Sequence, residues 1–365
     1  MIVKIGDVIS EYSVRNKFDE NIPVYSVTNE KGFCTGYFSK EVASKDKSTY
    51  KIVPRGYFAY NPSRINVGSV DWQKYEDRVI VSPLYVVFGV SDRLDRQYLL
   101  HYLKSDMMLS FIKEYATGSV RDNLKLADLG KLPINLRPVE EQRQIATTLD
   151  KIDDLIAKRR QQLDKLDELV KSRFIEMVGD CVVNPKGWKT KCLEDIAEVG
   201  SSKRVFIEEL QEAGIPFYRG TEVGALAEGK QISPELFITE EHYTELCKAT
   251  GAPQIGDLLM PSICPDGRIW VVNTEDPFYF KDGRVLWVHA IDNSYNPVFL
   301  LYTLKDRIMA DYSSIASGTT FAELKIFALK KCRIFDVPIA LQNEFAAFVA
   351  QTDKSKSFDD LEEAA

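Results

Sequence analysis

Apolar side chains recur at alternating steps of three and four residues through the middle of this chain. The series comprises Leu149, Ile152, Ile156, Leu163, Leu166, Val170 and Met177, with Arg159 and Arg173 in its two gaps. Between Pro138 and Gly179 there is neither Gly nor Pro, and Leu, Ile, Glu, Lys, Arg and Gln, all good helix formers, are abundant. The pattern predicts one long helix whose apolar stripe pairs with a second helix, as in a coiled coil. At 1.5 Å per residue, roughly 40 residues make a rod of about 60 Å, which we interpret as a spacer between two domains.

The ends of this helix carry the expected signals. Pro138 suits the first helical position, Glu140 and Glu141 complement the positive end of the helix dipole, and Gly179 supplies a stop.

The sequences on either side of the helix resemble each other. Residues 116–146 align with residues 316–346 without a gap. Matched positions include Gly118 with Gly318, Leu124-Lys125 with Leu324-Lys325, Leu129 with Leu329, Pro138 with Pro338, and Gln142 with Gln342. The same offset pairs Gly56 with Gly256 and Tyr102 with Tyr302. A shared register over this length indicates an internal duplication.

Each copy has the pattern of an α+β domain. Runs of β-branched and aromatic residues between turn signals predict short strands, at 22–25, 50–53, 57–60 and 79–88 in the first copy and at 216–219, 257–260, 269–272 and 284–289 in the second. Apolar residues at helical spacing follow at 96–115 and 297–312. We therefore expect an α+β fold with a pseudo-two-fold internal repeat. Its parts are a first domain (1–137), the central helix (138–180), a second domain (181–337), and a shortened distal helix with an acidic tail (338–365).

Composition and charge exclude several classes of protein. The six cysteines form no CxxC pair and the three histidines stand apart, so the sequence predicts neither a disulfide framework nor a zinc site. No apolar run approaches a membrane span, and no signal peptide opens the chain, so we expect a cytoplasmic protein. A net charge of −7 argues against general coating of nucleic acid, but it leaves open recognition through local basic patches.

Two segments of the central helix carry a resemblance to a known family. PVEEQRQIATTLDKIDDLI (138–156) and SRFIEMVGD (172–180) resemble the central conserved region of type I restriction-modification specificity (S) subunits. The two-copy layout and the second helix opening, LQNEF (341–345), match that family along nearly the whole chain. The resemblance implies two target-recognition domains, each reading one half of a bipartite DNA site, held apart by a coiled coil of conserved helices.

The resemblance also implies the partners. The chain itself is expected to do no chemistry and to bind no cofactor. It would bind double-stranded DNA, place two methyltransferase subunits on adenines of the two half-sites, and direct restriction once restriction (motor) subunits join. S-adenosylmethionine, ATP and Mg are expected on those partner subunits.

Candidate DNA contacts in the first domain lie in a turn-rich polar loop after a predicted strand. Asn61, Arg64 and Asn66 belong to this loop, and Asn and Arg side chains are suited to bidentate contact with adenine and guanine edges. The alternative is an ordinary surface loop. Arg121, after Gly118-Ser119, is a candidate either for phosphate contact or for capping the interdomain junction, and the sequence leaves both open.

In the second domain, basic and hydroxyl side chains stand next to small residues. Lys203 and Arg204 follow two serines, and Arg219 and Thr221 flank a glycine. Arg268, in the counterpart of the first domain's loop, is the foremost candidate for reading a base. Solvated surface positions are the alternative for all five residues.

Enzyme alternatives find little support. Asn61-Pro62-Ser63 resembles the N-P-P-[FY] motif of adenine methyltransferases, but it lacks the second proline and the aromatic residue that would stack on a flipped base. No glycine-rich loop for a nucleotide-like cofactor accompanies it. We therefore expect a non-catalytic subunit. The specificity part of a related type II enzyme and a coiled-coil scaffold that binds proteins remain as alternatives.

Overall fold

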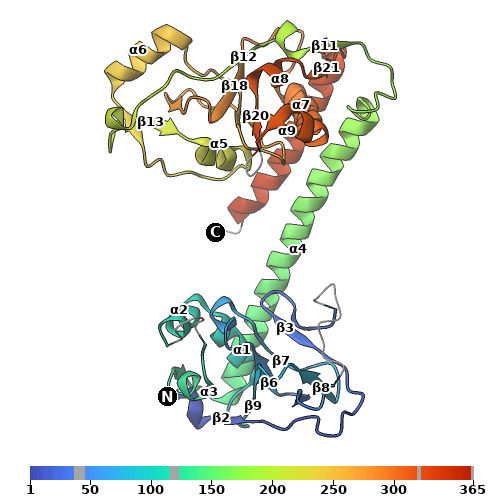
Figure 1. Ribbon diagram of the computed structural model, residues 1–365, viewed down its shortest axis with the longest axis vertical. Helices are drawn as coiled ribbons and strands as arrows, with labels where there is room; N and C mark the ends of the chain where they lie inside the picture. The colour runs from blue at the N-terminus through green and yellow to red at the C-terminus, as the bar shows by residue number, and fades with distance from the viewer. Residues whose placement is uncertain (37–45, 116–122, 319–321, 363–365) are drawn as a thin grey trace. The chain divides into compact units, whose positions relative to one another are not determined.

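The computed structural model describes residues 1–36, 46–115, 123–318 and 322–362, and the chain forms two compact units, 1–159 and 160–365. Figure 1 shows both, with helix α4 (Val139–Met177) running from one into the other. No helix among the described residues is both long enough and apolar enough to cross a membrane.

The first unit is built on an antiparallel four-stranded sheet. Its strand order is β2 (Ile9–Glu11), β9 (Val86–Val90), β6 (Phe58–Tyr60), β7 (Val70–Trp72). Three two-stranded pairs surround it: β1 (Ile2–Lys4) with β10 (Pro133–Asn135), β3 (Ser26–Thr28) with β4 (Gly32–Cys34), and β5 (Lys51–Pro54) with β8 (Arg78–Val81). Short 3-10 turns η1 (Ile5–Asp7) and η2 (Ile65–Val67) and helices α1 (Arg96–Lys104), α2 (Asp106–Tyr115) and α3 (Leu126–Leu129) complete the unit.

Aromatic residues from the central strands form the core of this unit. Phe58 stacks on Phe88 with ring centroids 5.0 Å apart, and Tyr60 meets Phe88 edge-on. Leu99 from α1 and Ile112 from α2 pack onto the same cluster. Burial of these side chains is what holds helices α1 and α2 against the sheet.

The second unit repeats this frame. Its four-stranded sheet has the order β12 (Glu198–Gly200), β18 (Val285–His289), β15 (Leu258–Pro261), β16 (Trp270–Val271), and β11 (Thr190–Cys192) pairs with β21 (Arg333–Phe335) as β1 pairs with β10. Even the register is kept, because Phe58 faces Phe88 in the first sheet and Leu258 faces Val288 in the second. The predicted α+β fold with an internal repeat is confirmed.

Different elements are inserted into the second frame. A sheet of order β14 (Phe237–Ile238), β13 (Ile215–Tyr218), β17 (Tyr279–Phe280) lies beside helices α5 (Gly220–Ala227) and α6 (Glu240–Thr250). Helix α7 (Pro297–Ile315) takes the place of α1 and α2, and α8 (Ile326–Lys330) that of α3. The smaller elements are η3 (Leu193–Asp195), η4 (Ile207–Glu209), β19 (Ala316–Ser317) and β20 (Glu323–Leu324).

Helix α4 is unbroken over 39 residues, beginning one residue after the predicted start at Pro138 and ending three residues before the predicted bound at Asp180. The helix ends shortly before Gly179, which adopts a φ of 95°. Residues other than glycine rarely adopt this conformation, so Gly179 supplies the predicted stop. In the second unit its last turns pack against α9 (Ile339–Glu362): Arg173 bonds to Glu344 at 3.0 Å, and Lys356 bonds to Asp167 at 2.7 Å. The contact residue on α4 moves back from 173 to 167 as its partner on α9 moves forward from 344 to 356, so the two helices are antiparallel.

The buried stripe of α4 differs in part from the predicted series. Val170 and Met177 are buried as expected, but Phe174 and Val178, which lie outside the series, are buried as well. Arg173, placed by the series on the stripe, instead forms ion pairs with Glu176 and Glu344. Alternating steps of three and four average 3.5 residues, so such a series drifts from the 3.6-residue period of a straight helix. Near the core of the second unit, the buried positions of α4 follow the 3.6-residue period.

Candidate nucleic-acid interface

The loop between β6 and β7 presents polar side chains on a fixed backbone. Ile65 in η2 is buried and anchors the loop, and Gly68 takes a left-handed conformation at φ 85° where η2 ends. Asn61 Oδ1 accepts hydrogen bonds from the backbone N–H and the hydroxyl of Ser63. The Asn61 amide nitrogen makes no hydrogen bond among the described residues.

Arg64 is the most available cation of this loop. It is exposed, and its guanidinium has neither an ion pair nor a hydrogen bond within the part of the chain that the structure describes. Asn66 is half-buried in the same turn. Asn61, Arg64 and Asn66 thus lie in the polar loop that follows β6, and their contact with DNA stays a prediction. Arg121 lies outside the described residues.

Two further lysines lie near this loop: Lys104, which the sequence did not single out, and Lys74, which from the sequence is a solvated residue with phosphate contact as the lesser alternative. Lys104 Nζ donates to the backbone carbonyl of Asn29, and a side chain at Gly68 would lie 4.0 Å from the Lys104 stem. Burial lowers the pKa of Lys104, and the nearby Asp71 carboxylate acts in the opposite direction. Lys74 pairs with Asp71 at 3.6 Å and lies over the Trp72 ring at 5.0 Å. Lys104 ends an amphipathic helix, where a basic residue is expected for dipole reasons alone, so its sequence position carried no separate signal.

In the second unit, Lys203 and Arg204 extend from a segment that serine side chains hold in place. Ser201 Oγ donates to the Val285 carbonyl at 2.7 Å, and the buried Ser202 Oγ donates to the Phe280 carbonyl at 2.6 Å. Neither Lys203 nor Arg204 has a carboxylate partner among the residues described, and Arg204 lies 5.5 Å from the ring of Phe206. An exposed cation on a fixed backbone is well suited to a phosphate.

The other three candidates gather around α5 and are already engaged. Arg219 contacts the Glu222 carboxylate at 2.6 Å and Glu235 at 3.2 Å, and the Thr221 hydroxyl donates to Glu222 at 2.9 Å. Arg268 pairs with Asp266 and Glu228 at 2.9 and 3.4 Å, and a Cβ at Gly224 of α5 would lie 3.1 Å from its guanidinium.

The Arg219–Glu222 pair is strong. Burial acts to raise the pKa of Glu222, but hydrogen bonds from Arg219, the backbone and Thr221 outweigh it and lower that pKa to about 2. Arg219 and Arg268 would have to exchange these carboxylates for phosphate or base atoms in order to contact DNA. Lys203 and Arg204 have no carboxylate partner among the described residues, so they could contact DNA without giving up such an ion pair.

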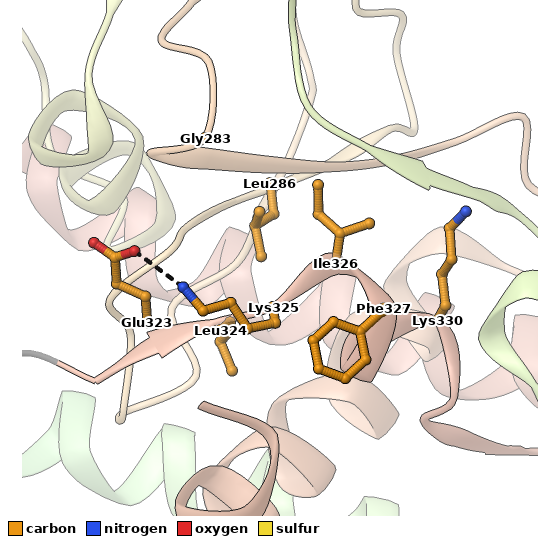
Figure 2. A pocket seen from close by; sticks show the side chains of 8 residues that line it. All are labelled: Gly283, Leu286, Glu323, Leu324, Lys325, Ile326, Phe327 and Lys330. Atoms are coloured by element: carbon orange, nitrogen blue, oxygen red, sulfur yellow. Dashed lines mark hydrogen bonds and ion pairs between the residues drawn. The ribbon is translucent and has the colours of Figure 1, made fainter. Parts of the chain in front are cut away.

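A shallow pocket of about 480 Å³ lies between β18, β20 and α8. Figure 2 shows its apolar side chains, Leu286, Leu324 and Ile326, with Glu323 and Lys325 joined at one end. Glu323 also pairs with Arg284, and Phe327 on the pocket's edge is 73% exposed. The one carboxylate here is therefore neutralised by two cations. Across the described residues, no group of three or more His, Cys, Asp or Glu side chains is placed to hold a metal ion.

Comparison with known proteins agrees with the fold. Residues 2–168 and 185–362 match the family described as type I restriction modification DNA specificity domain. The chain is 27% identical over 271 residues to a putative type I restriction enzyme specificity subunit, S.HindORF215P, of Haemophilus influenzae, covering 73% of this chain and 66% of that protein. It is 29% identical over 285 residues to the MjaIX specificity subunit of Methanocaldococcus jannaschii, covering 71% of this chain and 62% of that one. The matches thus span less than two thirds of these relatives' lengths.

Two solved structures share the fold. The type I restriction-modification S subunit from M. genitalium superposes with a TM-score of 0.53 at 16% identity, over 99% of this chain and 91% of that one. A chain from a structure on complex assembly and conformational transition of the type I R-M system gives a TM-score of 0.50 at 18% identity, over 100% and 92%. With the family matched over both units, the resemblance predicted from the helix motifs is confirmed, and the chain belongs to the type I restriction-modification DNA specificity family.

Proposed function

We propose that this protein is the sequence-reading subunit of a type I restriction-modification enzyme, in which each unit contacts one half of a bipartite DNA target. The observation that carries the proposal is the pairing of one repeated frame with two different sets of inserted elements. Equal frames favour equivalent docking on DNA, while different insertions favour reading different bases. The boundaries 1–137 and 181–337 define the two target-recognition domains in this proposal.

Helix α4 is proposed as the spacer. An unbroken helix of 39 residues spans about 60 Å, whereas one turn of B-DNA rises about 34 Å. Two reading domains joined by such a helix would prefer half-sites at one separation. Lengthening or shortening the helix should change the preferred gap and leave the half-sites themselves unchanged.

The chemistry belongs to partner subunits in this proposal. Two methyltransferase subunits carrying S-adenosylmethionine would bind the specificity subunit and modify one adenine in each half-site. Restriction subunits using ATP and Mg would join the same complex in the cytoplasm. The specificity part of a related type II enzyme would show the same DNA contacts, and only the partner subunits distinguish the two.

Modified-base sequencing of DNA from cells that carry this chain with its methyltransferase tests the proposal. The expected result is adenine methylation in a motif of two short half-sites with an unread gap of fixed length. Methylation in a single uninterrupted motif, or no methylation that depends on this chain, would overturn it.

Single substitutions then test the candidate contacts. Arg64→Ala should weaken binding or relax base preference in one half-site only, and Arg204→Ala should do the same in the other half-site. Loss of a phosphate contact should also reduce the slope of log affinity against log salt by about 1. Lys131→Ala is the matched control, because Lys131 is exposed but pairs with Asp128 at 2.7 Å. Arg64 or Arg204 variants that behave like this control would remove those residues from the interface.

A further inference from the structure

Two buried glutamines occupy the same place in the two units. Gln142, in the first turn of α4, is fully buried. Its Oε1 accepts from the backbone N–H of Asp95 at 2.8 Å, and its Nε2 donates to the carbonyls of Arg93 at 2.9 Å and Arg137 at 2.8 Å. Asp95 is the N-cap of α1, and Arg137 lies just before α4. One amide therefore joins the start of α4 to the start of α1.

Gln342, in the first turn of α9, makes the same three bonds in the second unit. It is also fully buried. Its Oε1 accepts from the backbone N–H of Asn296 at 2.9 Å, and its Nε2 donates to the carbonyls of Ser294 at 3.0 Å and Val337 at 2.7 Å. Asn296 is the N-cap of α7.

The two sets of partners are not related by a single numerical offset. Gln142 and Gln342 differ by 200 positions, whereas the N-caps Asp95 and Asn296 differ by 201. The segment before the N-cap of α7 is thus shifted by one residue relative to the segment before α1. Even so, each glutamine accepts a hydrogen bond from the backbone N–H of the N-cap residue. The contact has thus kept its geometry although the numbering around it has shifted.

We propose that Gln142 and Gln342 are positioning residues, which fix the direction in which α4 and α9 leave their respective DNA-reading units. The inference rests on the proposed function, because a fixed helix direction matters only if the helices set the gap between half-sites. A neutral amide supplies one acceptor and two donors at one point, which is what one N–H and two carbonyls require. Two of the three partners, the Asp95 N–H and the Arg93 carbonyl, belong to the segment that leads into α1, so movement of α4 relative to α1 would break both of these bonds at once.

Other side chains of similar size fail in different ways. Met has the right length, but it supplies no hydrogen bond to the Asp95 N–H or to the carbonyls of Arg93 and Arg137. Glu keeps the oxygen that accepts from the N-cap, but it sets its second oxygen against two carbonyl oxygens. Both Gln142→Met and Gln142→Glu should therefore loosen the helix on its unit. Gln144→Met is the matched control, since Gln144 is exposed on the same turn of α4.

The test uses the full chain assembled with its methyltransferase. Methylation rates are measured on DNA substrates that differ only in the gap between half-sites, by one or two base pairs on either side of the preferred length. Gln142→Met should lower the ratio of the rate at the preferred gap to the rates at neighbouring gaps, while base preference within each half-site stays the same. Gln144→Met should keep the wild-type ratio.

The outcomes separate the inference from the proposed function. A Gln142→Met complex that loses activity equally at every gap would show a merely structural role and overturn the inference. A wild-type complex without any gap preference would overturn the proposed function instead. The positioning role is then judged by hydrogen exchange: the amides of Asp95 and of the first turns of α1 and α4 should exchange faster in Gln142→Met than in Gln144→Met. Equal exchange in the two variants would end the inference regardless of DNA.

Discussion

Phe174 joins three helices of the second unit, and its removal tests how that unit holds the end of α4. The side chain is 1% exposed. Its ring centroid lies 5.1 Å from that of Phe345 on α9, 6.0 Å from Phe299 and 6.1 Å from Tyr302, both on α7. Phe174→Ala would empty the centre of this aromatic cluster.

The expected loss follows from burial and ring contacts. Truncating a buried Phe to Ala costs roughly 3–5 kcal/mol, because transfer free energy is lost and a cavity remains. Contacts between aromatic rings add about 0.5–1.5 kcal/mol per pair beyond the buried area, which favours the upper half of that range. We expect the free energy of unfolding of the second unit to fall by about 4 kcal/mol. With a urea m-value of roughly 2 kcal/mol/M, the unfolding midpoint should fall by about 2 M.

Tryptophan fluorescence can follow the second unit alone. Three of the four tryptophans, Trp188, Trp270 and Trp287, lie in this unit, so a Trp72→Phe background removes the signal of the first. Leu169→Ala is the control on the same helix within the second unit: Leu169 is 50% exposed, and its truncation should change stability by no more than about 0.5 kcal/mol. Equal midpoints for the two variants would refute the claim that Phe174 anchors α4.

Three further outcomes follow from other sites. Because the pKa of Glu222 is lowered to about 2 in the folded state, its contribution to stability is present above about pH 4.5 and is lost as the pH falls towards 2; Glu222→Gln should flatten the pH dependence of urea unfolding in that window. Burial raises the pKa of the Cys264 thiol to about 12, so mass spectrometry after iodoacetamide treatment at pH 8 should find the half-exposed Cys34 alkylated well before it, and the reverse order would contradict the burial. Phe327→Ser should leave thermal unfolding nearly unchanged, since that ring is already in water, and a loss above about 1 kcal/mol would show that the pocket's edge is packed.

Long-range regularities of the sequence predicted the frame well. The ends of α4 were predicted to within three residues, because Pro138 and Gly179 act locally and no interior residue competes with helix formation. The repeat at an offset of 200 predicted that the two copies share one layout, and the structure adds that they share a strand register, with Phe58 opposite Phe88 and Leu258 opposite Val288. The helix-end residues and the internal repeat can both be recognised in the sequence without knowing which side chains are in contact in the folded protein.

Availability of the basic side chains could not be predicted in the same way. Arg219 and Arg268 are as polar in sequence as Lys203 and Arg204, yet folding brings carboxylates to the first two and not to the others. The Glu228 carboxylate that meets Arg268 is 40 residues away in sequence. A cation's freedom is a property of the folded neighbourhood, so a motif identifies candidates but does not rank them.

The two units show how one frame can accommodate different inserted elements, which are the recognition surfaces under the proposed function. In both, the central sheet and the glutamine at the helix start are kept, whereas the connection between the first and second of the frame's sheet strands in chain order differs: β3, β4 and β5 follow β2, while β13, α5, β14 and α6 follow β12. Arg219 and Thr221 belong to this variable connection, and Arg64 lies in the following loop, between β6 and β7. A change of inserted elements would alter the bases read and leave the helix attachment intact. Half-site preference and gap preference should therefore vary independently, and substitutions that always change both together would refute this division of roles.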